Sequence, residues 1–280
     1  MKSDFWFGQV PLLGVFLLTA VVILLSIGIG TLWGGRRRSQ PDHEAETPLG
    51  TIIGSTLGLL AFMLGFTYSI AANFVQTRRD LFLDEINAIS TVYLQSQLLD
   101  EAYRSELSNL IREYVNIRVE LMDADVSDIH KAVARSDSIQ DEIWKNAFAL
   151  IKSDIYPEMN ALFISSLNKM FDLQTSRVVA FRYRIPAIIW YALYFITILS
   201  MITVGFQVGL SGKSMFKMGI VLMLTFSTVM LLIADLDRPL EGYFQVDKRP
   251  IFNLQKKIQA ATQQKNENLE HKQNSIKKNN

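Results

Sequence analysis

The chain of 280 residues has no cysteine and only three histidines, His43, His130 and His271. Without cysteine there is no disulfide, no thiolate nucleophile and no cysteine metal site. The histidines are scattered through polar segments, and no two lie at a spacing that would hold one metal ion. The chain also lacks a complete G-x-x-x-x-G-K-[ST] phosphate-binding loop and a nucleophile elbow. These absences predict that the protein is not an enzyme. A membrane enzyme without a familiar motif is kept as a third alternative.

Charge is nearly balanced, with 28 Lys and Arg against 27 Asp and Glu, so nothing predicts a nucleic-acid partner. The charges avoid four long apolar blocks. These blocks contain no Asp, Glu or Arg, and their only base is Lys217: Val10–Trp33, Thr51–Phe74, Ala187–Leu210 and Phe216–Ala234. Carboxylates inside the blocks, the usual mark of a proton-coupled transporter, are missing.

Each block is about as long as the roughly 20 residues that a helix needs to cross a bilayer. The alternative, four buried helices of a soluble core, would require four helices without a polar face. The first block is too long for a cleavable signal peptide, and its only early base is Lys2. We therefore predict an all-α, multi-pass membrane protein with four transmembrane helices in two pairs, separated by a long helical domain.

The spacing of apolar residues divides the chain into four parts. Residues 1–74 are predicted to form the first transmembrane pair, 75–185 a helical domain, 186–235 the second pair and 236–280 a polar tail. The tail is expected to be largely disordered after about 259, or else to form a short helix that frays. Within the helical domain, Arg118 is the polar exception on an apolar stripe, and Pro157 suits the first turn of a helix. Ser127 and Ser136 are candidate helix caps.

Positive charge beside the spans favours a cytoplasmic location for both termini and the helical domain. An even number of spans puts these segments on one side, and that side has more bases near the membrane than the other. The bases on it are Lys2, Arg78, Arg79, Arg177, Arg182, Arg184, Arg238, Lys248 and Arg249. Local evidence disagrees, because Arg36, Arg37 and Arg38 follow the first span in a short loop on the opposite side.

The second block carries a stripe of small residues. Gly50, Gly54, Gly58 and Gly65 recur at helical spacing, which lets two helix backbones approach closely. Close packing on another helix is the simplest explanation of this stripe. A neighbouring stripe combines two rings with small polar groups: Ser55, Phe62, Phe66, Ser69 and Asn73. Around an axis made by several copies, such a stripe would line a pore, and the rings would form a hydrophobic constriction. The alternative is that both rings are core or lipid-facing aromatics.

The segment "FMLGFTYSIAANF", from Phe62 to Phe74, resembles the second span of bestrophins. "LGLLAFMLGFT", "DEINAISTVYLQSQLL" and "ADLDRPLEGYFQV" are similar to the bestrophin-like domain family of bacterial membrane proteins. The resemblance implies that Phe62, Gly65 and Phe66 match the neck of a pentameric anion channel, whereas Gly58 replaces the third bulky neck position. It also implies a cytoplasmic helical domain and cytoplasmic termini.

Acidic residues flank the second and fourth spans. Bestrophins bind calcium near the place of Asp235, Asp237 and Glu241, which makes these carboxylates candidate ligands. The alternative is an interfacial turn ended by a proline. Asp84 and Glu85 are candidates to pair with Arg78 or Arg79, or with a base from another helix near the third span such as Arg182 or Arg184, or else to line a vestibule.

We therefore expect a homo-oligomer, a pentamer by the resemblance, in a bacterial inner membrane. It would pass small anions such as chloride through a pore lined by the second span, with no cofactor except calcium. The alternative is a non-conducting membrane scaffold or sensor whose cytoplasmic helices bind a partner.

Overall fold

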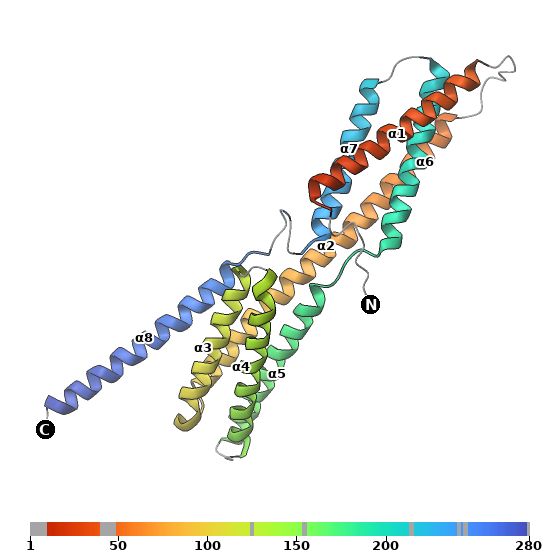
Figure 1. Cartoon of the computed structure of the whole chain (residues 1–280). Coiled ribbons are helices and arrows are strands. Elements are labelled where there is room, and N and C mark those ends of the chain that lie inside the picture. Colours follow the sequence, from red (N-terminus) through yellow and green to blue (C-terminus); the bar gives the residue numbers. More distant parts are fainter. Residues whose placement is uncertain are drawn as a thin grey trace. The chain divides into compact units, whose positions relative to one another are not determined.

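The computed structural model describes residues 10–39, 49–123, 126–152, 156–212, 216–239, 242 and 246–278, and these residues form helices and connecting turns without a strand. Figure 1 shows the helices in chain order. They are α1 (Leu12–Arg38), α2 (Leu49–Ser96), α3 (Glu101–Asp123), α4 (Val126–Lys152), α5 (Pro157–Ala180), α6 (Ala187–Ser211), α7 (Phe216–Asp237) and α8 (Arg249–Lys278).

The chain divides into two units, each with its own apolar core. The span unit contains Met1–Thr77 and Arg182–Gln245, and the amphipathic unit contains Arg78–Phe181 and Val246–Asn280. Among the described helices, α1, α2, α6 and α7 are long and apolar enough to cross a membrane. Helix α2 has 48 residues, or about 72 Å at 1.5 Å per residue, so it is far longer than a bilayer core of about 30 Å requires.

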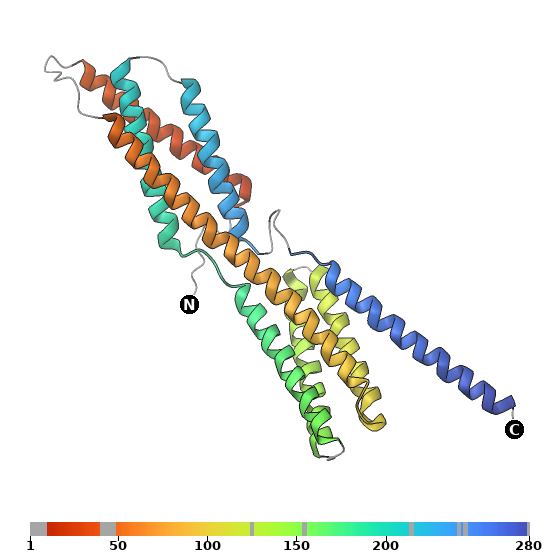
Figure 2. The same cartoon turned by 180° about the vertical axis from the view of Figure 1, so that it is seen from behind.

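In the span unit, α1 packs along α6 and α7 (Figures 1 and 2). The hydroxyls of Thr19 and Tyr194 lie 2.8 Å apart, and Gly30 meets the backbone of Ile202. Both contacts advance together along the two helices, so α1 and α6 are parallel. Helix α2 contributes Leu60 to the same core and touches α6 where the Ser200 hydroxyl donates to the Thr56 carbonyl at 3.2 Å.

Glycines allow the close approach of α1 and α6. A Cβ on Gly30 or Gly34 would collide with backbone atoms of α6, and one on Gly205 or Gly209 would collide with backbone atoms of α1. Apolar side chains gain little by leaving lipid, so association in a membrane depends on such backbone contact. The spacing of four residues within each pair can be read from the sequence, although no contact between these glycines was predicted.

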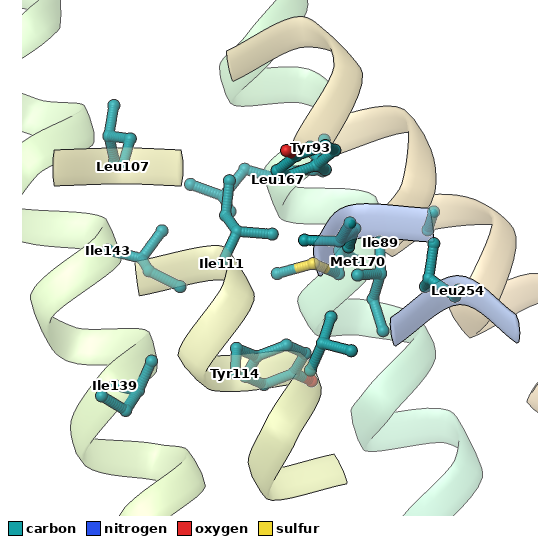
Figure 3. Close-up of a cluster of buried hydrophobic side chains, with 14 of the residues drawn as sticks. Ile89, Tyr93, Leu107, Ile111, Tyr114, Ile139, Ile143, Leu167, Met170 and Leu254 are labelled. Atoms are coloured by element: carbon teal, nitrogen blue, oxygen red, sulfur yellow. The ribbon is translucent and has the colours of Figure 1, made fainter. Parts of the chain in front are cut away.

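The amphipathic unit buries residues from all five of its helices in one core. Figure 3 shows Ile89 of α2, Ile111 of α3, Ile143 of α4, Met170 of α5 and Leu254 of α8 converging there. Helix α8 runs antiparallel to α3, because Lys248 at its start donates to the Met122 carbonyl and Gln255, about two turns on, donates to Asn116 at 2.9 Å. The periodicity found in the sequence therefore corresponds to the buried faces of a helical bundle.

Two details differ from the sequence analysis and one agrees. Helix α8 continues to Lys278, where an unstructured tail after about residue 259 was expected; Lys, Gln and Glu are common there and favour helix. Ser136 is not a helix cap but a buried residue inside α4. Pro157 does begin α5, as predicted.

Candidate pore face and buried ion cluster

The predicted pore residues lie on an outward face of α2. Phe62 is 67% exposed and Phe66 54% exposed, and their rings stack with centroids 6.5 Å apart and planes 13° apart. Ser55, Ser69 and Asn73 are exposed on the same helix. The structure thus brings the predicted residues to one exposed surface, which we call the α2 face.

The α2 face differs in composition from the exposed surface of α1. Helix α1 presents large aliphatic side chains, among them Leu13, Leu17 and Leu25, as expected for a surface against lipid. The α2 face instead presents glycines, serines and Asn73. Polar groups facing hydrocarbon are costly, so this face is better suited to another protein surface or to water than to lipid.

Within the part of the protomer that the structure describes, the four glycines predicted for helix packing have no packing partner. A Cβ at Gly50, Gly54, Gly58 or Gly65 would meet nothing within 4 Å. These glycines therefore do not hold the protomer together. Their use in close packing stays a prediction.

Of the acidic residues after the fourth span, Asp237 links two helix ends. Its Oδ1 accepts the backbone N–H of Ile185 at 2.7 Å, and Arg184 donates to its carbonyl. Ile185 lies two residues before α6 begins, so Asp237 joins the end of α7 to the start of α6.

Residues beside Asp237 at the C-terminal end of α7 also make contacts inside the span unit. Arg238 donates to the carbonyl of Val10 at 2.5 Å, and Asp235 is buried against Gly242, whose φ is +109°. Among the described residues, no three His, Cys, Asp or Glu side chains are grouped to hold a metal ion. Glu241 lies outside the described residues, and the calcium site stays a prediction.

Glu85 lies at the centre of a buried ion cluster in the amphipathic unit. Only 1% of its side chain is exposed; Oε1 lies 2.7 Å from Arg118 Nη2 and Oε2 lies 2.5 Å from Arg177 Nη1. Both arginines are themselves buried. The four bases named from the sequence were therefore wrong for Glu85, whose partners are Arg118 of α3 and Arg177 of α5. Arg177 does lie on another helix shortly before the third span, as the second alternative expected. The sequence did contain a sign of this pairing, because Arg118 is a charged residue on an otherwise apolar helical stripe.

Hydrogen bonds and rings complete the cluster. Tyr114 donates to Gln174 Oε1 at 2.6 Å, and Gln140 donates to the same oxygen. The Arg177 guanidinium lies over the ring of Phe82, 4.5 Å from its centroid. Four helices, α2 to α5, thus meet through polar groups inside an otherwise apolar core.

The charges of the cluster set the pKa of Glu85. Burial alone would raise this pKa, but the guanidiniums of Arg118 and Arg177 outweigh burial and hold it below the ordinary value of 4.5. Burial, above all, raises the pKa of the Tyr114 hydroxyl. Glu85 therefore stays ionised and Tyr114 stays neutral near pH 7, so the cluster acts as a fixed support for the bundle.

Comparisons with known proteins agree with this architecture. A family model described as "Bestrophin-like domain" matches residues 17–251, well over half of the chain. No curated protein matches. Crystal structures of point variants of a bacterial bestrophin homolog from Klebsiella pneumoniae share the fold. One has a TM-score of 0.62 at 13% identity, over 87% of this chain and 96% of that chain.

A second of these structures has a TM-score of 0.60 at 14% identity, over 88% of this chain and 93% of the other. Identity at this level supports the fold and not the activity. The family match, which spans all four apolar helices, identifies the relationship. The chain belongs to the bestrophin-like domain family and is an integral membrane protein.

Proposed function

We propose that several copies of the chain form a closed ring in which the α2 faces line a passive channel for small anions such as chloride. The observation that carries this proposal is the α2 face itself: a fully apolar helix would suit lipid, but this one exposes Asn73 and two serines beside two phenylalanines. Ring closure would turn these groups toward an aqueous axis and leave the large aliphatic residues of α1 facing lipid.

Phe62 and Phe66 form the constriction in this proposal. Stacked rings from each subunit would make a narrow apolar collar, which closes to water unless an ion enters with little hydration. The edge of an aromatic ring is electropositive and favours an anion there. Asn73 and Ser69, further along the helix, would offer donors to the same ion.

The ring is a homo-oligomer, and the relationship to bestrophins suggests five subunits. Gly50, Gly54, Gly58 and Gly65 lie on the α2 face with open space beside them, so a neighbouring copy can approach the backbone closely there. By the balance of basic residues, the termini and the amphipathic unit lie in the cytoplasm of a bacterium, and the spans lie in its inner membrane.

Chloride efflux from liposomes tests the proposal. We expect efflux from the reconstituted chain, with a rate or anion preference that changes in Phe62→Ala and Phe66→Ala because the collar widens. Phe195→Ala is the matched control: its ring is also exposed on a span, at 63%, but it belongs to α6. Native mass spectrometry of the same samples gives the number of subunits.

Three outcomes would contradict the proposal. Folded protein without efflux in any form would favour a non-conducting protein. A monomer or dimer could not enclose the proposed axis. An equal effect of Phe195→Ala and Phe62→Ala would show that the rings act on general packing and not in a conducting path.

The alternative function, a scaffold or sensor, is supported by an exposed apolar stripe on α4. Trp144, Phe148 and Ile151 lie at helical spacing in the amphipathic unit and are 41%, 54% and 49% exposed. Such a stripe is typical of a surface that binds another protein. In this case the spans serve as an anchor, and replacing the α2 rings alters stability without altering any flux.

A further inference from the structure

Ser136 is a buried polar residue of the amphipathic unit that the ion cluster around Glu85 does not use. Its side chain is fully covered inside α4, and its hydroxyl has no hydrogen-bond partner among the described residues. Buried hydroxyls elsewhere in this chain bond to a carbonyl one turn back, as Thr19 does to Val15 at 2.8 Å. A buried hydroxyl without a bond is costly, because folding removes its hydration and supplies nothing in return. Ser136 therefore offers a free donor inside the bundle.

Arg118 offers a second buried donor. Its Nη2 lies 2.7 Å from Glu85 Oε1, but its Nε has no hydrogen-bond partner among the described residues. Only 7% of the Arg118 side chain is exposed, so bulk water does not hydrate this N–H freely. A guanidinium keeps its charge, and its N–H groups bond most strongly to an acceptor that is negatively charged.

The helices that carry these donors, α3 and α4, run antiparallel. Asn146 in the last turns of α4 donates to Glu106 near the start of α3 at 3.1 Å. Figure 3 shows Ile139, further back in α4, level with Tyr114, further on in α3. A step back along α4 therefore corresponds to a step forward along α3.

This register brings the two donors to one level of the bundle. Tyr114 of α3 and Gln140 of α4 donate to the same oxygen of Gln174. Arg118 follows Tyr114 by one turn, and Ser136 precedes Gln140 by one turn. Because the helices are antiparallel, both turns lead in the same direction from Gln174. Arg118 and Ser136 thus follow the shared oxygen on two neighbouring helices.

The ion cluster beside these donors has an excess of positive charge. Glu85 supplies one negative charge against the two guanidiniums of Arg118 and Arg177. Burial lowers the pKa of Arg177; Glu85 opposes this effect, but the charge of Arg118 adds to it, and the pKa lies below its ordinary value. One carboxylate therefore does not fully offset two buried guanidiniums, and an uncompensated buried charge is costly.

We propose that the Ser136 hydroxyl and Arg118 Nε bind one chloride ion inside the amphipathic unit. The ion accepts both hydrogen bonds and supplies the missing negative charge, which a neutral water would not do. Both donors are almost completely covered, so a monatomic anion suits the site better than a polyatomic one. The bound ion is a structural part of the bundle, and the proposal does not depend on conduction through the spans.

Asp137 is the competing source of negative charge. Burial lowers the pKa of Arg118, but Glu85 and, more weakly, Asp137 outweigh burial and raise it. Asp137 is exposed, so water and salt screen its charge more than they screen a buried ion. If Asp137 alone offsets the excess charge, the stability of the protein will not depend on chloride.

The test is thermal unfolding of the purified full chain in sodium chloride and in sodium gluconate at equal ionic strength. Chloride held only by the folded chain should raise the melting temperature as its concentration increases. Ser136→Ala removes one hydrogen bond to a charged group and should weaken the apparent chloride affinity by about tenfold or more. Ser138→Ala, at an exposed serine of the same helix, is the matched control and should keep the affinity, as should Asn73→Ala on the α2 face.

Ser136→Asp distinguishes a bound anion from a bound water. A carboxylate fixed at this position takes the place of chloride, so the variant should melt above the unaltered chain in gluconate and should no longer respond to chloride. At a water site, the same buried carboxylate would lower the melting temperature.

Four results would each overturn the proposal. They are equal melting temperatures of the unaltered chain in the two salts, an equal response of Ser136→Ala and Ser138→Ala, a lower melting temperature of Ser136→Asp in gluconate, and a chloride response that persists in Ser136→Asp. The last result would assign the response to another part of the protein, and loss of the response in Asn73→Ala would assign it to the α2 face.

Discussion

Two sets of glycines in the span unit look alike in sequence and differ in structure. Gly30 and Gly34 of α1 face Gly205 and Gly209 of α6 so closely that no side chain fits between the backbones. Gly54 and Gly58 of α2 have the same spacing of four residues, but a Cβ on either of them would meet no described residue within 4 Å. The spacing therefore shows that a helix permits close approach, but whether the partner is in the same chain depends on the fold.

A similar contrast separates two adjacent carboxylates of the amphipathic unit. Glu85 is buried between Arg118 and Arg177, whereas Asp84, one residue earlier, is exposed. A helix turns by 100° per residue, so neighbours in sequence can face the core and the solvent. In both comparisons, one member makes its contacts inside the protomer and the other lies on the protomer surface.

The largest expected effect comes from replacing the buried carboxylate of Glu85. Glu85→Gln should lower the free energy of unfolding by about 3–5 kcal/mol, because two buried guanidiniums lose their counter-charge. Asp84→Asn, the matched control, should change it by less than about 0.5 kcal/mol. Thermal or denaturant unfolding in detergent measures both. Equal effects of the two variants would show that the ion cluster is not a special support of the bundle.

The two sets of glycines should respond differently to the same substitution. Gly205→Val forces a side chain against the backbone of Ile27 and should cost about 1–3 kcal/mol or more. Gly58→Val meets nothing in the protomer, so it should leave protomer unfolding nearly unchanged and lower the number of subunits that stay together. Unfolding and native mass measured on both variants test the contrast. A fully assembled Gly58→Val oligomer would indicate that the α2 glycines do not form the subunit contact.

The smallest effect concerns pH. The pKa of Glu85 is lower in the folded state than in the unfolded state, so the unfolded state binds its proton first as the pH falls. The cluster therefore contributes its full stability above the ordinary value of 4.5, and this contribution is lost as the pH falls from there toward the folded pKa. Between about pH 6 and about pH 3, the melting temperature should therefore fall less steeply in Glu85→Gln than in the unaltered chain. Parallel curves would contradict the assignment.

Much of the local structure was predictable from the sequence. The four apolar blocks became α1, the first half of α2, α6 and α7, because a run of about 20 apolar residues has few alternatives to a span. Pro157 begins α5 because proline suits the first helical turn. The pore residues gather on one face because they share the period of the helix.

Contacts between distant segments were not predictable in the same way. Arg177 is 92 residues from Glu85, and no local spacing indicates that pair. Arg182 and Arg184, named because they lie near the third span, are also far from Glu85 in the chain, and which distant base reaches Glu85 depends on how α3 and α5 pack against α2. The close contact between the glycines of α1 and α6 was not predicted either. The spacing within each pair can be read from the sequence, but the contact between the two pairs depends on how α1 and α6 are placed in the fold.

The pairing of α1 with α6 has a consequence for the order of biosynthesis. Thr19 and Tyr194, which touch across this contact, are separated by 175 residues. At roughly 5–20 residues per second, the ribosome needs about 10–35 s to make the intervening chain. During that time α1 has no α6 to pack against, and Gly30 and Gly34 are open to lipid or to a chaperone. The tightest backbone contact of the span unit is therefore among the last to form.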